Sequence, residues 1–189
     1  RDSFDAVIAT GSDNTARYFE AYFKNVPAII RKNRNSVCVL TGNESDHQLK
    51  GLSEDIFRYY GLGCRSVSKL FVPKNYNFDN FFKAMYDWHT ILNSTKYANN
   101  YDYNKAVYLM SQYKLIENGF LILKKDVRYA SPIATLHYEF YEDLETLKSR
   151  IKSDISLIQC VVSKNFIDGE VAFGLSLIHI SEPTRPLHI

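Results

Sequence analysis

The sequence predicts an α/β domain with a largely parallel β-sheet. Short apolar runs typical of buried strands alternate along the chain with longer segments whose apolar residues recur at helical spacing. Glycine and proline residues separate many of these segments. The chain has 189 residues, of which 46% are hydrophobic, so it is long enough to bury one substantial core.

The first predicted unit is a strand, a glycine turn and a helix. Residues 4–9 form a short apolar run that ends at Thr10, Gly11 and Ser12, and residues 13–24 then space their apolar side chains as a helix does. A proline ends the unit. The basic segment after it is interpreted as a solvated linker, although it could also contact phosphates.

The second predicted unit carries a cysteine between a helix and a strand. Residues 36–40 are a β-rich run suited to a buried strand, and Ser45 can cap a helix that extends to about residue 60. Two glycines end that helix, and residues 66–72 alternate into another strand. Cys64 is therefore expected in a polar turn, outside any apolar run.

The remaining elements continue the alternation of helices and strands, with a polar break around residues 93–100. We expect further helices at residues 78–92, 104–112 and 142–152, and further strands at residues 120–124, 133–138 and 156–162. His137 and Glu139 alternate along one strand and so share one face of it. Such a face can border the site or lie on the outer surface, and we expect the outer surface.

Composition excludes several classes of partner and site. The 23 Lys and Arg against 21 Asp and Glu give a net charge of +2, too weak to imply nucleic acid or an anionic membrane surface. No apolar run is long enough to cross a bilayer, so membrane insertion is not expected. Cys38, Cys64 and Cys160 form no C-x-x-C pair, which argues against zinc and a disulfide framework and favours a reducing, cytoplasmic setting.

Three segments of the chain, in this order, carry a recognisable pattern. They are Phe4-Asp-Ala-Val-Ile-Ala-Thr-Gly-Ser12, Gly61-Leu-Gly-Cys-Arg-Ser-Val-Ser-Lys-Leu-Phe-Val72 and Ser131-Pro-Ile-Ala-Thr-Leu-His-Tyr-Glu-Phe-Tyr-Glu-Asp-Leu-Glu-Thr-Leu147. Together they resemble the aldehyde dehydrogenase superfamily, and within it they are most similar to the acyl-CoA reductases that supply long-chain fatty aldehyde in bacterial bioluminescence. In that superfamily the corresponding segments are a strand and turn that meet a dinucleotide, a glycine-x-x-cysteine turn that carries the nucleophile, and a proline-containing strand with an acidic-capped helix near the nicotinamide ribose.

The resemblance implies an enzyme that reduces a long-chain acyl thioester to an aldehyde with NADPH. Cys64 would be the nucleophile that carries the acyl group, and Thr10, Gly11 and Ser12 would touch the cofactor. No metal is implied. The implied substrate is a long-chain acyl-CoA or an acyl-protein thioester, and the implied protein partners are a second copy of the chain or an acyl-transferase.

One departure from the superfamily pattern favours reduction over hydrolysis. Aldehyde-oxidising members carry a glutamate upstream of the cysteine, where it activates the water that hydrolyses the thioester. Residues 29–36 occupy the corresponding place and contain no carboxylate. Without a base aimed at it, water competes poorly for an acyl-enzyme.

The resemblance also implies a division of the chain into three parts. Residues 1–34 would be the C-terminal remnant of a dinucleotide-binding domain, and residues 35–174 an aldehyde dehydrogenase-like catalytic domain that bears the thiol. Residues 175–189 look like the translation of a sequencing adapter and are expected to be an artefactual tail that buries little. We expect the chain to be an internal fragment that does not turn over by itself.

Two other interpretations stay open. One is a CoA-acylating aldehyde dehydrogenase for short-chain substrates, which acyl chain length preference would distinguish. The other is a non-catalytic α/β module with a structural cysteine, and in that protein Cys64 would react with a thiol reagent no faster than Cys38 or Cys160.

Overall fold

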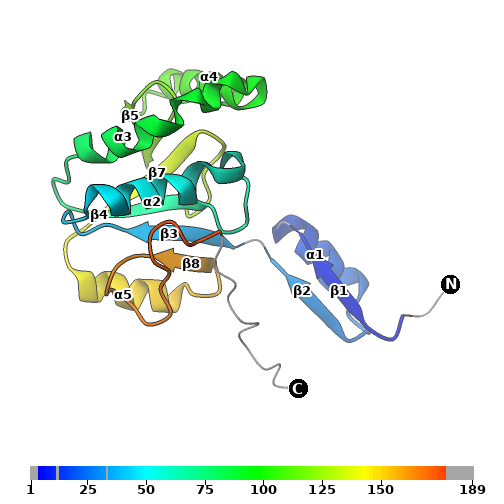
Figure 1. The fold of residues 1–189 in the computed structure, drawn as a ribbon. Helices are drawn as coiled ribbons and strands as arrows, with labels where there is room; N and C mark the ends of the chain where they lie inside the picture. The colour runs from blue at the N-terminus through cyan, green and yellow to red at the C-terminus, as the bar shows by residue number, and fades with distance from the viewer. Residues whose placement is uncertain (1–3, 12, 33, 178–189) are drawn as a thin grey trace. The chain divides into compact units, whose positions relative to one another are not determined.

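The computed structural model describes residues 4–11, 13–32 and 34–177, and it divides into two units (Figure 1). Unit 1 is Arg1–Arg34 and unit 2 is Asn35–Ile189, so the division falls where the sequence analysis places its first domain boundary. The functional identities given to the two parts remain predictions.

Unit 1 is a strand, a helix and a second strand. These are β1 (Val7–Thr10), α1 (Asp13–Tyr22) and β2 (Ala28–Arg31). β1 and β2 pair in parallel, and Ala16 of α1 is fully buried. The interpretation of the basic segment 31–34 as a solvated linker is wrong at Arg31, because this residue is the last of β2 and pairs with Thr10 of β1.

Unit 2 is built on a six-stranded sheet with the order β5-β6-β7-β4-β3-β8. All neighbouring pairs are parallel except β5 and β6, which confirms the predicted largely parallel α/β fold. The strands are β3 (Asn35–Val39), β4 (Val67–Pro73), β5 (Leu115–Glu117), β6 (Ile122–Lys125), β7 (Thr135–Tyr141) and β8 (Ile158–Val162).

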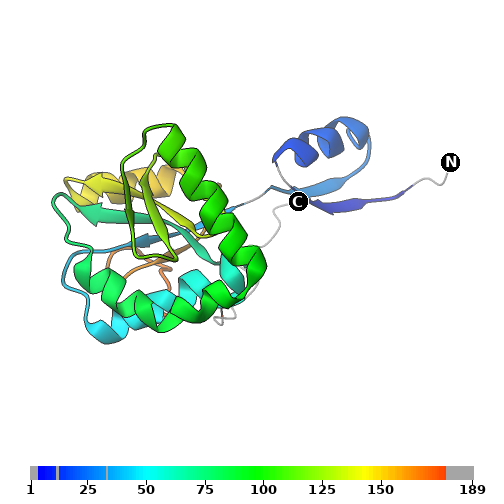
Figure 2. The same ribbon diagram turned by 90° about the horizontal axis from the view of Figure 1, so that it is seen from above.

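Helices cover both faces of this sheet, as Figure 2 shows from above. The larger apolar core lies under one group of helices, and a smaller core lies under α5 on the other face. The helices are α2 (Asp46–Phe57), the 3-10 helix η1 (Arg58–Gly61), α3 (Asp79–Met85), the 3-10 helix η2 (Tyr86–Asn93), α4 (Thr95–Met110) and α5 (Leu144–Ser153). None of the described helices is long and apolar enough to span a membrane.

Capping residues start two of these helices where the sequence places a helix start. The Ser45 hydroxyl accepts the backbone N–H of Gln48, whose side chain in turn accepts the N–H of Ser45, so the two form a capping box. Asp143 caps α5 in a similar way, since its carboxylate accepts the N–H of Thr146 at 2.7 Å.

The α4 segment differs most from the sequence prediction. A polar break was expected up to residue 100, but the helix begins at Thr95. Tyr97, Tyr101 and Asn104 are buried along one side of it. Their packing against the core outweighs the weak helix propensity of the asparagine-rich stretch.

The expected surface position of His137 and Glu139 is also wrong. β7 lies inside the sheet, and Asp126 and Arg128 of the connection from β6 to β7 contact side chains of this face, so His137 is only 1% exposed. Its Nδ1 contacts the carbonyl oxygen of Arg128, and burial lowers the pKa of His137 to about 4. On the same face Lys69 is fully buried, and its Nζ donates to Glu139 at 2.8 Å and to the carbonyl of Asp126.

The start of the expected artefactual tail is more closely packed than predicted. Ser176 is fully buried, and its N–H and hydroxyl donate to Asp55 of α2 at 2.9 and 2.7 Å. Gly174 N–H donates to the same carboxylate at 2.7 Å. The expectation of weak packing is therefore wrong at Ser176, because the buried Asp55 needs these donors. Residues 178–189 lie outside the described residues.

Candidate functional site

Cys64 lies at the corner of a tight turn that leads from η1 into β4. Ser66 N–H donates to the carbonyl of Gly63 at 2.9 Å, and Gly63 N–H donates back to the Ser66 hydroxyl at 3.1 Å. These two bonds close the turn around Cys64, whose thiol is free and exposed. No hydrogen bond of the Cys64 thiol or amide is found among the described residues. The turn thus presents a thiol and an available backbone donor on a fixed support.

The backbone just before this turn is left-handed over three consecutive residues. Tyr59, Tyr60 and Gly61 have φ values of 56°, 60° and 71°. For residues other than glycine the left-handed conformation costs roughly 1–2 kcal/mol each, and such strain persists only where neighbouring structure holds it in place. The carbonyl of Tyr59 accepts the N–H of Leu62 at 3.1 Å, which links the strained segment to the turn of Cys64. The sequence analysis identified only a helix end here.

The cations close to Cys64 in sequence are engaged elsewhere. Lys69 is committed to Glu139 and to the carbonyl of Asp126, as described above. Arg65 Nε donates to the carbonyl of Ser176 at 2.5 Å. Proximity in sequence therefore does not place the charge of Lys69 at the thiol.

The other two cysteines lie in strands, buried from solvent. Cys38 is fully buried in β3, and Cys160 is 8% exposed in β8, where its thiol donates to the Ser36 hydroxyl at 3.1 Å. Burial raises the pKa of both thiols above the ordinary value, which disfavours the reactive thiolate. Cys64 is thus the cysteine that is open to a substrate.

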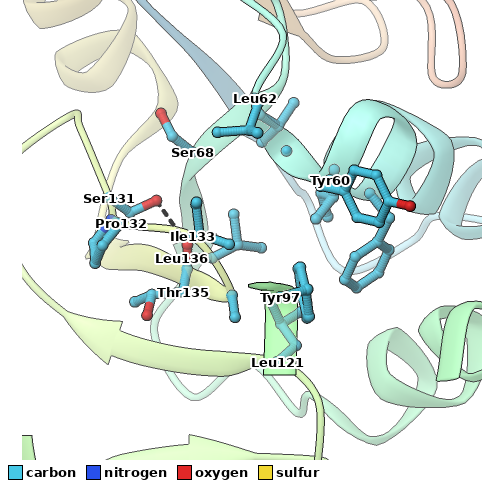
Figure 3. Close-up of a pocket in the computed structure, with 15 residues that line it drawn as sticks. Tyr60, Leu62, Ser68, Tyr97, Leu121, Ser131, Pro132, Ile133, Thr135 and Leu136 are labelled. Carbon is cyan, nitrogen blue, oxygen red and sulfur yellow. Dashed lines mark hydrogen bonds between the residues drawn. The ribbon is translucent and has the colours of Figure 1, made fainter. Parts of the chain in front are cut away.

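Two adjoining cavities lie beside the Cys64 turn. The inner one has a volume of about 90 Å³ and the outer one about 330 Å³, and both are lined by Tyr60, Leu62, Tyr97 and Ile133. Figure 3 shows the inner cavity between Leu62 and Tyr60 on one side, the 131–133 segment on another, and Tyr97 with Leu121 below. Tyr97, which lies within the stretch expected to be a polar break, belongs to α4 and forms part of the wall of both cavities.

The turn proposed to touch the cofactor belongs to unit 1, whereas Cys64 belongs to unit 2. A Cβ atom added at Gly11 would lie 2.9 Å from the Cβ of Thr15, so glycine is required for the strand to pack this closely on α1. The strand, glycine turn and helix start fit a phosphate, but Gly11 N–H already donates to the carbonyl of Arg31 at 3.2 Å. Thr10 is exposed at the end of β1, and Ser12 lies outside the described residues.

Metal ligands and a carboxylate base are two other kinds of group that could contribute to a site. The described residues include no cluster of three or more His, Cys, Asp or Glu side chains that could hold a metal ion. The 29–36 segment has no carboxylate by sequence, and in the structure residues 29–31 belong to β2 and residues 35–36 to β3.

Comparison with known proteins shows which solved structures have a similar fold. The sequence matches no protein-family model and no curated protein sequence. The structure is similar to a mutant of the P. syringae AldA indole-3-acetaldehyde dehydrogenase in complex with NAD+ and IAA, with 13% identity, 84% of this chain and 40% of that chain covered, and a TM-score of 0.57. It is also similar to aldehyde dehydrogenase 21 from Physcomitrella patens in complex with succinate, with 14% identity, 78% and 37% covered, and a TM-score of 0.57.

A third similar structure is a mutant of Proline Utilization A from Bradyrhizobium japonicum, with 15% identity, 89% and 21% covered, and a TM-score of 0.60. The chain therefore has an aldehyde dehydrogenase-like α/β fold. It spans less than half of the length of each of these proteins.

Proposed function

We propose that this chain is the thiol-bearing part of an aldehyde dehydrogenase-type oxidoreductase that reduces a long-chain acyl-CoA to fatty aldehyde through a Cys64 thioester. The observation that carries the proposal is the exposed Cys64 thiol, held in a closed turn before a central strand of this fold. A nicotinamide cofactor is part of the proposal because a structure of similar fold binds NAD+, and NADPH is our choice from the sequence resemblance. An acyl group on a protein thioester is an equivalent donor.

The first step uses Cys64 of this chain as the nucleophile. The Cys64 thiolate attacks the acyl carbonyl carbon, a new carbon–sulfur bond forms, the bond between that carbon and the CoA sulfur breaks, and the CoA thiolate leaves and takes a proton from solvent. The developing oxyanion needs a hydrogen-bond donor, and the Cys64 N–H is available for that role. When bound, a reduced nicotinamide would supply the hydride that reduces the thioester, after which aldehyde leaves and the thiolate is restored.

Reduction is favoured over hydrolysis because no group for activating water is evident near the thiol. Residues 29–36 carry no carboxylate, and the Cys64 thiol has no hydrogen-bonded base among the described residues. The acyl-enzyme should therefore persist until a thiol or a hydride donor arrives.

The test is covalent labelling followed by mass spectrometry. Incubation of the chain with a long-chain acyl-CoA and no reductant should add one acyl group to Cys64, and hydroxylamine should remove it. Cys64→Ser should abolish the adduct, because a hydroxyl stays protonated near neutral pH. Cys160→Ser is the matched control, in which labelling should persist as long as the protein folds. Equal labelling of Cys64→Ser and the parent would refute the proposal and favour a structural cysteine.

A further inference from the structure

We propose that Asn118 is a site of spontaneous deamidation in the folded chain, and that the turn in which it lies promotes the reaction. Gly119 follows Asn118, and this is the only Asn-Gly pair in the sequence. The turn connects β5 to β6, and in it Asn118 N–H donates to the carbonyl of Leu121 at 3.4 Å. The proposed function uses none of these residues, so the two proposals can fail independently.

The side-chain carbonyl of Asn118 is held and polarised by two backbone donors. Its Oδ1 accepts the N–H of Phe120 at 3.3 Å and the N–H of Leu121 at 3.0 Å. Because both donors follow Gly119 in the chain, the side chain is folded over the Gly119 peptide rather than turned away from it. Two N–H groups that point at a carbonyl oxygen also stabilise the negative charge that develops there when the carbon is attacked.

The attacking group would be the backbone nitrogen of Gly119, and it is unhindered. Gly119 is exposed, and apart from its chain neighbours no residue has an atom within 4 Å of the place where a Cβ would stand. Its N–H donates no hydrogen bond within the described part of the chain. Solvent base can therefore reach this N–H, and no side chain at position 119 obstructs closure of a five-membered ring onto the Asn118 side chain.

The leaving group would be the side-chain nitrogen of Asn118. This Nδ2 atom is buried, and it has no hydrogen-bond partner among the residues that the structure describes. A buried donor without an acceptor is costly in the folded state. Its departure breaks no hydrogen bond and removes that cost, so the folded state does not oppose the reaction at this atom.

The reaction needs water as its only co-reactant. Solvent base removes the Gly119 N–H proton, the nitrogen bonds to Cγ of Asn118, and the bond from Cγ to Nδ2 breaks as Nδ2 takes up a proton and leaves as ammonia. Water then opens the succinimide ring. If the bond from nitrogen to Cγ breaks, the product is aspartate. If the bond from nitrogen to the main-chain carbonyl carbon breaks, the product is isoaspartate, in which the backbone runs through Cγ.

The two products should differ in their effect on the wall of the inner cavity. Aspartate keeps an oxygen that accepts the N–H groups of Phe120 and Leu121, whereas isoaspartate adds a methylene group to the backbone and displaces both donors. Phe120 is 2% exposed, and its carbonyl accepts the hydroxyl of Tyr97 at 3.0 Å. Leu121 and Tyr97 line the inner cavity (Figure 3). Isoaspartate at position 118 should therefore loosen this wall.

The test is incubation of the full 189-residue chain at mildly alkaline pH, followed by trypsin digestion and mass spectrometry. Trypsin releases residues 115–124 as one peptide, because Lys114 and Lys124 bound it. Deamidation adds about 1 Da to that peptide. Synthetic peptides with aspartate or isoaspartate identify each product by its retention, and a sample digested without incubation corrects for deamidation during digestion.

We expect the folded chain to deamidate Asn118 at least as fast as the same chain unfolded in guanidinium chloride. A folded chain that stays intact at Asn118 while the unfolded chain reacts would overturn the proposal. That outcome would show that the hydrogen bonds to Oδ1 immobilise the side chain instead of activating it.

Gly119→Ala is the matched variant. It keeps Asn118 and the donors to its Oδ1, and the space at position 119 is open, but the added methyl group hinders ring closure. We expect loss of the deamidated peptide over the time in which the parent chain reacts. Deamidation of folded Gly119→Ala at the parent rate would also overturn the proposal. Because Gly119 has a φ of 94°, circular dichroism must first show that the variant folds, and the comparison of folded and unfolded parent chain does not depend on it.

Urea unfolding tests the effect on the cavity wall. The Asn118→Asp chain should unfold at the same urea concentration as the fresh parent, and an incubated chain enriched in isoaspartate should unfold at a lower one. Equal midpoints for the fresh and the isoaspartate-rich chain would overturn the predicted loosening of the wall.

Discussion

Removing the carboxylate that neutralises Lys69 should destabilise the protein more than removing Lys69 itself. Lys69 is fully buried, and its Nζ contacts one carboxylate, Glu139, at 2.8 Å, whereas Glu139 also accepts two bonds from Arg150 at 2.5 and 3.3 Å. Burial lowers the pKa of Lys69, and the hydrogen bond to Glu139 opposes this shift. Burial opposes ionisation of Glu139 too, but hydrogen bonds from Arg150 and Lys69 hold its pKa below the usual value.

The expected magnitudes follow from what each substitution leaves behind. Glu139→Gln leaves a buried ammonium without its hydrogen-bonded carboxylate partner, which costs about 3–5 kcal/mol. Lys69→Met keeps the volume and leaves Glu139 paired with the partly exposed Arg150, so we expect a loss of only about 1–2 kcal/mol. In the double variant, Glu139→Gln should cost about 2–3 kcal/mol less than it costs alone, because the buried ammonium is already absent. This difference is the coupling energy of the pair.

Urea unfolding of the four proteins at pH 7, followed by circular dichroism, measures these differences as shifts of the midpoint at constant slope. Glu139→Phe is unsuitable as a comparison because it changes volume as well as charge. Equal losses in Glu139→Gln and Lys69→Met, or additive losses in the double variant, would show that the two side chains do not form a buried pair.

Three further predictions concern single contacts. Ser66→Ala removes the hydroxyl that accepts the Gly63 N–H in the Cys64 turn, so acylation of Cys64 should slow by about tenfold while the unfolding midpoint changes little. An unchanged rate would show that the turn does not need this hydrogen bond. Burial lowers the pKa of His137 from 6.5 to about 4, so the unfolded state binds the proton more readily than the folded state does. The free energy of unfolding should therefore fall by about 3 kcal/mol as the pH drops from 6.5 to 4. In unfolding titrations, His137→Leu should flatten this dependence on pH. Tyr97→Phe loses a buried hydrogen bond of 3.0 Å to the carbonyl of Phe120 and should cost about 1–2 kcal/mol in the same assay, and no loss would mean that water replaces it.

The local elements of this chain could be predicted because short-range physics determines them. Apolar runs and helical spacing located β3, β4 and α2, and the polarity of its side chain placed Ser45 at a helix start. The same reasoning placed Cys64 in a turn, because its neighbours are glycines and polar residues rather than a strand. Alternation of these elements was sufficient to predict a largely parallel sheet.

Features that depend on contacts distant in sequence were decided by the tertiary structure alone. β2 exists because β1 pairs with it, and α4 extends to Thr95 because its tyrosines pack on the core. His137 is buried because the connection from β6 to β7 contacts its face of the sheet through Arg128. An alternating pattern of residues cannot reveal such a contact.

The candidate site shows the same division between sequence and structure. Sequence identified Cys64 as the candidate nucleophile, but the left-handed conformation of Tyr59 and Tyr60 appears only in the folded backbone. The outer cavity beside the Cys64 turn is lined by three segments far apart in sequence, which contribute Leu62, Tyr97 and Ile133. A cavity is a property of how segments pack together, and packing partners are not encoded in any local pattern of residues.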